Sequence, residues 1–132
     1  MGSILARTTT EIRCTIPSRI PRIPFADIAR DILSERYILS LVVCGDTLAR
    51  RINRAYRKKD YSPNVLSFPL GEYEGEIFLN VRKAEREARA AGISTRERIA
   101  LLFVHGCLHL RGLQHGAEME KLEESTLKKS GF

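Results

Sequence analysis

The most informative stretch of the sequence is His105-Gly-Cys-Leu-His109-Leu-Arg-Gly112-Leu-Gln-His115, which holds all three histidines of the 132-residue chain. His105 and His109 are four residues apart, so on a helix their rings lie on one face and can converge on one metal ion. An unbroken helix would turn about 600° and rise roughly 9 Å from His109 to His115, which would carry the third ring away. Gly112 is predicted to end the helix in a left-handed conformation and to bring His115 back. The stretch therefore predicts a helix, a turn and a three-histidine metal site with one open position, the pattern of catalytic zinc.

Other interpretations of this stretch stay open. One alternative is that these are ordinary histidines on a half-buried helix, an explanation that suits a lone histidine better than three at this spacing. An Asp or Glu could complete a closed structural site, whereas Cys107 is predicted to point off the ligand face because it is two residues past His105. Metzincin proteases share the spacing, H-E-x-x-H-x-x-G-x-x-H, and use the Glu as general base. Gly106 stands at that position here and cannot accept a proton, which weakens a protease interpretation.

Length and composition predict one globular domain over residues 1–132, with 43% hydrophobic and 29% charged residues. The apolar runs are too short to span a membrane, and no signal peptide is recognised, so we expect a cytoplasmic protein. Cys14, Cys44 and Cys107 are odd in number and widely spaced, without a C-x-x-C pair. This usage predicts reduced, mostly buried thiols.

Hydrophobic periodicity predicts elements in the order β-α-β-α-β-β-α-α-α. Strands are expected at 9–16, 37–44, 64–69 and 76–80, and helices at 25–35, 46–56, 81–91, from a capping box at 94–97 onward, and at about 117–128. The fold class is α/β (α+β): a single domain with a small mixed four-stranded sheet, about five helices, and the metal helix packed on the sheet.

Single residues at the predicted element ends carry sharper expectations. Asp46 is predicted to cap the second helix, and Asn80 and Gly92 are predicted to begin and end the third. Gly71 and Gly75 are predicted to separate the third and fourth strands. The inward face of the second helix is predicted to carry Leu48, Ile52 and Ala55.

The net charge of +6 and the pI of about 9.5 favour polyanionic partners. Most of the basic residues in 50–59 and 82–89 are expected on solvated helix faces. Arg57, Lys58 and Lys59 differ because they enter a loop just before a strand, where basic side chains can approach a ligand.

Five segments together resemble the YbeY family of endoribonucleases that mature ribosomal RNA. The histidine stretch is similar to the family's H-G-x-L-H-L-x-G-x-x-H signature. Asn53-Arg-Ala-Tyr-Arg57 and Asn64-Val-Leu-Ser-Phe-Pro69 are similar to its N-x-x-Y-R and [DN]-V-L-S-F-P segments, and Gly75-Glu-Ile to its G-[DE]-I strand. Met119-Glu120 and Glu123-Glu124 resemble its C-terminal helix, so the likeness runs from about 53 to 127.

The resemblance implies one zinc ion held by His105, His109 and His115 in a cleft, and hydrolysis of single-stranded RNA. It also implies processing of the 3′ end of the small-subunit rRNA, ribosome quality control, and contact with the small subunit or its proteins. It assigns required roles to Arg57 and His105. Two departures are Leu113-Gln114, where many members have Tyr-Asp, and Pro63, where Thr is common.

A mechanism follows as a hypothesis. Zinc lowers the pKa of bound water to about 7, so a carboxylate base is not needed. Arg57 would stabilise the phosphoryl transition state through its forked guanidinium. The alternative is a purely structural role for Arg57 in a surface ion pair with Asp60. Asn64 and Ser67, with Lys58 and Lys59, are candidate substrate contacts. For Asn64 and Ser67 the alternative is ordinary strand-end hydrogen bonding.

Two rival functions remain. One is a noncatalytic, zinc-containing ribosome-assembly factor. A carboxylate in the fourth coordination position of the zinc would favour it. The other is a metallohydrolase of another substrate class, which a Glu or Asp beside the metal would support.

Overall fold

A computed structural model describes residues 9–17 and 19–132. Four strands form one mixed sheet in the order β1-β2-β4-β3. Strands β1 (Thr9–Cys14), β2 (Ile38–Cys44) and β4 (Glu74–Asn80) run parallel, and β3 (Val65–Gly71) pairs antiparallel with β4. The predicted order of elements and the four-stranded mixed sheet are confirmed.

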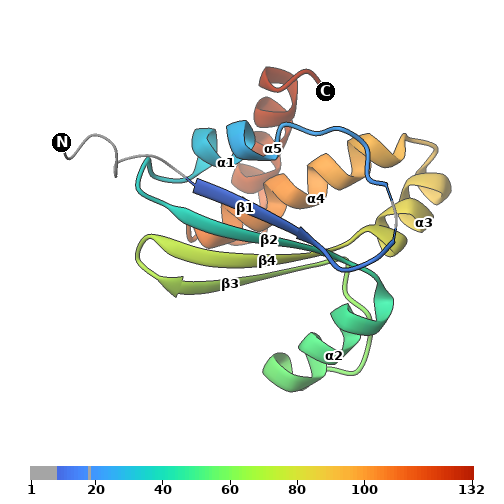
Figure 1. The fold of residues 1–132 in the computed structure, drawn as a ribbon. Helices are drawn as coiled ribbons and strands as arrows, with labels where there is room; N and C mark the ends of the chain where they lie inside the picture. Colours follow the sequence, from blue (N-terminus) through green and yellow to red (C-terminus); the bar gives the residue numbers. More distant parts are fainter. Residues whose placement is uncertain (1–8, 18) are drawn as a thin grey trace.

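Five helices surround this sheet unequally (Figure 1). Helices α1 (Phe25–Ile32), α4 (Thr95–Leu110) and α5 (Ala117–Lys129) lie over one face, with α3 (Val81–Ala91) beside α4. Helix α2 (Asp46–Arg57) lies on the opposite side. The main core therefore lies between the sheet and α4, the central helix of the larger layer.

The central strand β2 buries both of its faces. Leu39, Leu41 and Val43 belong to the main core, and the alternating Val42 and Cys44 pack with the smaller cluster under α2. This alternation follows from the two-residue period of a strand, and covering on both faces explains the nearly continuous apolar sequence. The sheet under the histidine-bearing helix is thus built around a strand that is covered on both faces from Leu39 to Cys44, with only Ser40 half-buried.

The predicted start of α2 was wrong in detail. Gly45 is the N-cap, and Asp46 is the first helical residue with its carboxylate turned to Asn80 and Arg86. Ala55 is exposed, whereas Ala49 and Asn53 are buried. Each helical residue is rotated by about 100° from the one before it, and the buried face of α2 is centred between Ile52 and Asn53. Ala55 lies about a quarter-turn from that centre and is therefore exposed.

Gly71 and Gly75 lie inside strands and do not separate them, contrary to the prediction. The chain reverses at Glu72 and Tyr73, and the register slips between Pro69 and Gly71. Gly75 is small for a packing reason, because a Cβ there would collide with the Tyr37 hydroxyl and with Leu110 at the end of α4. The glycine predicted as a turn signal therefore permits close approach of a helix to a strand.

Several local predictions are confirmed. The Asn80 side chain accepts a hydrogen bond from Lys83 N at the start of α3, and Gly92 ends that helix with φ 70°. The Ser94 hydroxyl accepts from Glu97 N at the start of α4. Helix α1 ends at Ile32, three residues earlier than expected.

The thiols of Cys44 and Cys107 are buried, and that of Cys14 is exposed. Within the described part of the chain, no helix has both the length and the apolar character needed to cross a membrane.

Candidate metal centre

Helix α4 and the turn after it position the three histidines. His105 and His109 lie on one face of α4, and the helix ends at Leu110. Leu113 N donates to Leu108 O and Gly112 N donates to His109 O, the two hydrogen bonds of a Schellman motif. Gly112 has φ 102°, which only glycine adopts without strain. The helix therefore stops where the sequence predicts, and the chain turns back toward the histidine face.

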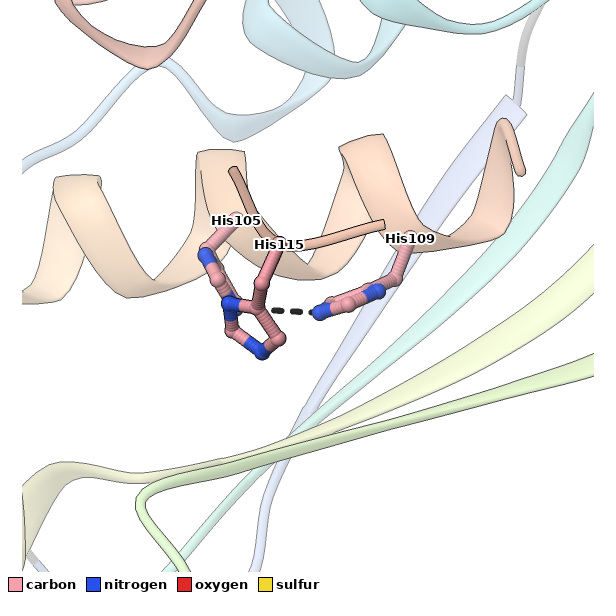
Figure 2. A group of neighbouring side chains, drawn as sticks. All are labelled: His105, His109 and His115. Carbon is pink, nitrogen blue, oxygen red and sulfur yellow. Dashed lines mark hydrogen bonds between the residues drawn. The ribbon is translucent and has the colours of Figure 1, made fainter. Parts of the chain in front are cut away.

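The three imidazole rings converge (Figure 2). His105 Nε2 and His109 Nε2 are 3.0 Å apart. The His115 ring centroid is 4.7 Å from that of His105 and 4.9 Å from that of His109. One nitrogen from each ring lies within 4.8 Å of the others, so the trio can hold one metal ion. His105 and His109 are partly buried and His115 is exposed, which leaves the site open on the His115 side.

Glu123 of α5 fixes the orientation of His105. Its Oε2 lies 2.8 Å from His105 Nδ1, and the side chain is only 13% exposed. An Nδ1–H that donates to this carboxylate leaves the Nε2 lone pair of His105 facing His109. Carboxylate–histidine pairs of this kind orient metal-binding histidines and raise their basicity.

The surroundings of His109 favour its neutral form. Burial lowers its pKa below the usual range, and the neighbouring His105 and His115 lower it further. The neutral imidazole is the ligand form, so the surroundings favour a ready lone pair. Cys107, by contrast, lies in the main core, and burial raises the pKa of its thiol.

Gly106, at the position where metzincins carry their base, faces the sheet. A Cβ at this position would lie 3.0 Å from Ser67 Oγ, 3.2 Å from Ile77 Cδ1 and 3.3 Å from Val65 Cγ2. The Ser67 hydroxyl donates to Gly106 O at 3.0 Å. A glutamate here would be driven between α4 and β3, so the site has no room for the protease base.

The histidines line an open cleft of about 1020 Å³, which Arg57, Asn64 and Ser67 also line. Arg57 is the last residue of α2 and forms no ion pair within residues 9–17 and 19–132. Asp60, the alternative partner, instead pairs with Arg50 at 2.8 Å and Arg54 at 3.6 Å. Among the described residues, the Arg57 charge therefore has no ion-pair partner beside the histidine cleft.

Of the four other residues predicted to contact the substrate, two line the cleft and two do not. Lys58 and Lys59 do not line this cleft, and Lys58 adopts a left-handed conformation (φ 60°) that ends α2. Asn64 lines the cleft, but its amide donates to the Glu87 carboxylate at 3.2 Å. Ser67 is likewise engaged with α4. Hydrogen bonding within the fold, the alternative considered for Asn64 and Ser67, is thus what their side chains do.

Sequence patterns missed three residues around the cleft. Glu123 follows the buried Met119 by one helical turn, and a carboxylate on the buried face of α5 is a usable signal of a polar partner. Tyr61 and Lys83 also line the cleft, from a loop and from α3. They come from elements far apart in the chain, and no local pattern joins them.

A family model described as endoribonuclease YbeY matches residues 21–131 of the chain. The chain is 38% identical over 104 residues to endoribonuclease YbeY of Polynucleobacter asymbioticus, covering 72% of this chain and 67% of that protein. It is 41% identical over 98 residues to the Helicobacter pylori protein of that name, covering 71% and 68%. The match spans about two thirds of the length of these relatives.

A solution structure from Thermotoga maritima has the same fold, with a TM-score of 0.66 at 21% identity over 91% of this chain and 89% of that one. That likeness agrees with the mixed sheet and its helices. The family model, the two relatives and the ordered set of motifs agree, and the chain belongs to the YbeY endoribonuclease family.

Proposed function

We propose that this chain is a zinc-dependent endoribonuclease that cuts single-stranded RNA. Its role would be maturation of the 3′ end of the small-subunit rRNA and ribosome quality control, in the cytoplasm and in contact with the small subunit. One observation carries the proposal: in a member of the YbeY family, three convergent histidines line the same open cleft as an arginine that forms no ion pair with any described residue.

The donor set suits zinc. Imidazole nitrogens are common zinc ligands, and three protein ligands leave a position for water or substrate. Glu123 bonds the Nδ1 side of His105, so it acts as an orienting partner and not as a fourth ligand. Zinc bound there would supply Lewis acidity toward a phosphoryl oxygen and a water of pKa near 7.

Arg57 supplies the second element of the chemistry. Its guanidinium is always charged and can bond two phosphate oxygens at once. An arginine on the wall of the metal cleft is placed to stabilise the added negative charge of a phosphoryl transition state. The rival protease chemistry lacks a base at the metzincin position, where Gly106 faces the sheet. The Glu123 carboxylate is engaged with His105 Nδ1.

The test uses purified zinc-loaded protein with matched single-stranded and duplex RNA. The wild type is expected to cut the single strand. Arg57→Ala is expected to lower cleavage by about a hundredfold or more while keeping bound zinc, and His109→Ala to lose both zinc and cleavage. Arg89→Ala is the charge-matched control, because Arg89 is exposed on α3 outside the cleft.

The outcomes separate the candidate functions. A folded wild type that holds zinc and binds RNA but never cuts it would favour the assembly-factor alternative. Cleavage that survives His109→Ala without zinc would refute the ligand assignment. End-group analysis then chooses the nucleophile, because a 2′,3′-cyclic phosphate rules out direct attack by water.

A further inference from the structure

We propose that the ring of Tyr61 is a stacking platform for one unpaired nucleobase of the RNA held in the cleft, an inference that rests on the proposed function. Tyr61 is 47% exposed and lines the same cleft as the three histidines and Arg57. Tyr56 and Tyr73 are exposed to 71% and 41%, and neither lines this cleft. Tyr61 is thus an exposed tyrosine on the wall of the cleft that also holds the three histidines and Arg57.

The backbone under Tyr61 is fixed before any ligand arrives. Asn53 Nδ2 donates to Tyr61 O at 3.1 Å, and the Ser62 hydroxyl donates to Asp46 O at 3.2 Å. Asn80, fully buried, donates to Pro63 O at 3.1 Å. Three successive residues of the loop are therefore held from α2 and β4. A ring on a preorganised backbone loses little conformational freedom when a base stacks on it.

A cation accompanies the ring. Lys83 Nζ lies 5.7 Å from the centroid of the Tyr61 ring and donates to Ser62 O at 2.7 Å. This contact is with a neutral carbonyl oxygen, which does not neutralise the lysine charge. The neighbouring Arg98, by contrast, is paired with Glu87 at 2.9 Å.

The composition of this wall fits single strands. An aromatic ring with cations alongside is the usual surface for single-stranded nucleic acid, since every base offers a flat face. A base inside a duplex is already stacked on its neighbours and is not available to Tyr61. The platform therefore gives a physical reason for a preference for single-stranded RNA that the metal site alone does not provide.

The test measures binding of a short, unstructured, fluorescently labelled RNA by anisotropy, and its cleavage by the zinc-loaded protein. Tyr61→Ala is expected to raise Kd and KM by about 5- to 150-fold, the equivalent of one lost base–aromatic stack, with zinc content unchanged. Tyr61→Leu, which keeps apolar bulk without a flat ring, is expected to behave like Tyr61→Ala, whereas Tyr61→Phe loses much less. Tyr73→Ala is the matched control, because that tyrosine is similarly exposed at the β3–β4 turn.

An abasic substitution series in the RNA identifies the stacked nucleotide. At one position, removing the base is expected to erase the difference between wild type and Tyr61→Ala. Wild-type affinity in both Tyr61→Ala and Tyr61→Leu, or an equal loss in Tyr73→Ala, overturns the platform. If the wild type binds RNA through Tyr61 yet never cuts it, the platform stands and the nuclease proposal falls.

Discussion

Removal of the Glu123 carboxylate is expected to weaken zinc binding without unfolding the protein. Glu123 Oε2 accepts from His105 Nδ1 at 2.8 Å, and both side chains are largely buried, at 13% and 20% exposure. Without that acceptor, the His105 ring can rotate or carry its proton on Nε2, where the ligand lone pair is needed. Glu123→Ala therefore acts on the metal through the orientation of one ligand.

The magnitude follows from the contact. A hydrogen bond to a charged group contributes about 1.5–3 kcal/mol, which corresponds to roughly 10- to 150-fold in a binding constant. Loss of an orienting partner of a metal ligand typically costs about 10- to 100-fold in affinity. We expect Glu123→Ala in the upper part of this range, because the pair is short and shielded. Glu123→Gln is expected to lose less, since its amide oxygen can accept the same hydrogen bond without the charge.

The assay is competition for zinc against a chromophoric chelator at neutral pH, with thermal unfolding as the check on folding. Histidine ¹⁵N spectra of the metal-free protein add a second measurement, because they report which nitrogen of His105 carries the proton. Glu124→Ala is the matched control, the adjacent and exposed carboxylate of α5. If Glu123→Ala holds zinc as tightly as Glu124→Ala and leaves the His105 tautomer unchanged, the orienting role is refuted.

Two further predictions concern stability. The hydrogen bond from Arg86 lowers the pKa of Asp46 from 3.8 to about 2, so the stability it adds is present above pH 3.8 and is lost as the pH falls toward 2. Because Asp46 is 40% exposed, solvent screening reduces its expected contribution to about 1 kcal/mol. In Asp46→Asn, the free energy of unfolding in urea should fall by about 1 kcal/mol less than in the wild type as the pH is lowered from 3.8 to 2. The same fall in both proteins would contradict the role of Asp46. Gly106→Ala is expected to destabilise by about 1 kcal/mol, because crowding against Ser67 and the sheet outweighs the better helix propensity. In a Ser67→Ala background, Gly106→Ala should reduce the free energy of unfolding by less than it does in the wild type. If the effects of the two substitutions on that free energy, measured in urea, simply add, the contact with Ser67 is not the cause.

Local sequence signals predicted the elements that depend on neighbouring residues. The Schellman turn at Gly112, the side-chain cap at Asn80 and the serine cap of α4 are each set within a few residues of chain, and all three lie where expected. The failures concern contacts across the fold. Gly75 and Asp46 carry turn and cap signals, but their environments are decided by α4 and by α3.

In the candidate site, too, the residues set by local sequence were predictable, and those brought together across the fold were not. The histidine trio is predictable because one helix and one turn generate it. The cleft wall opposite is assembled from the end of α2, the loop before β3 and the first turn of α3, so no spacing rule joins Arg57 to Tyr61 or Lys83. The blocks resembling the family supplied Arg57, but Tyr61 and Lys83 emerge only from the three-dimensional arrangement.

Helix α4 contributes both to the core and to the candidate metal site, and this constrains both. Val104, Cys107 and Leu108 are buried in the core while His105 and His109 face the cleft from the same two turns. Metal sites tolerate errors of only about 0.2 Å in ligand distance, so the ligands must sit on an element that cannot slide. The absence of a side chain at Gly106 lets α4 rest directly on β3, where the Ser67 hydroxyl fixes it by a bond to the helix backbone. Gly106, at the position where metzincins carry their base, therefore lets α4 pack closely on β3 and helps to fix the helix that carries His105 and His109.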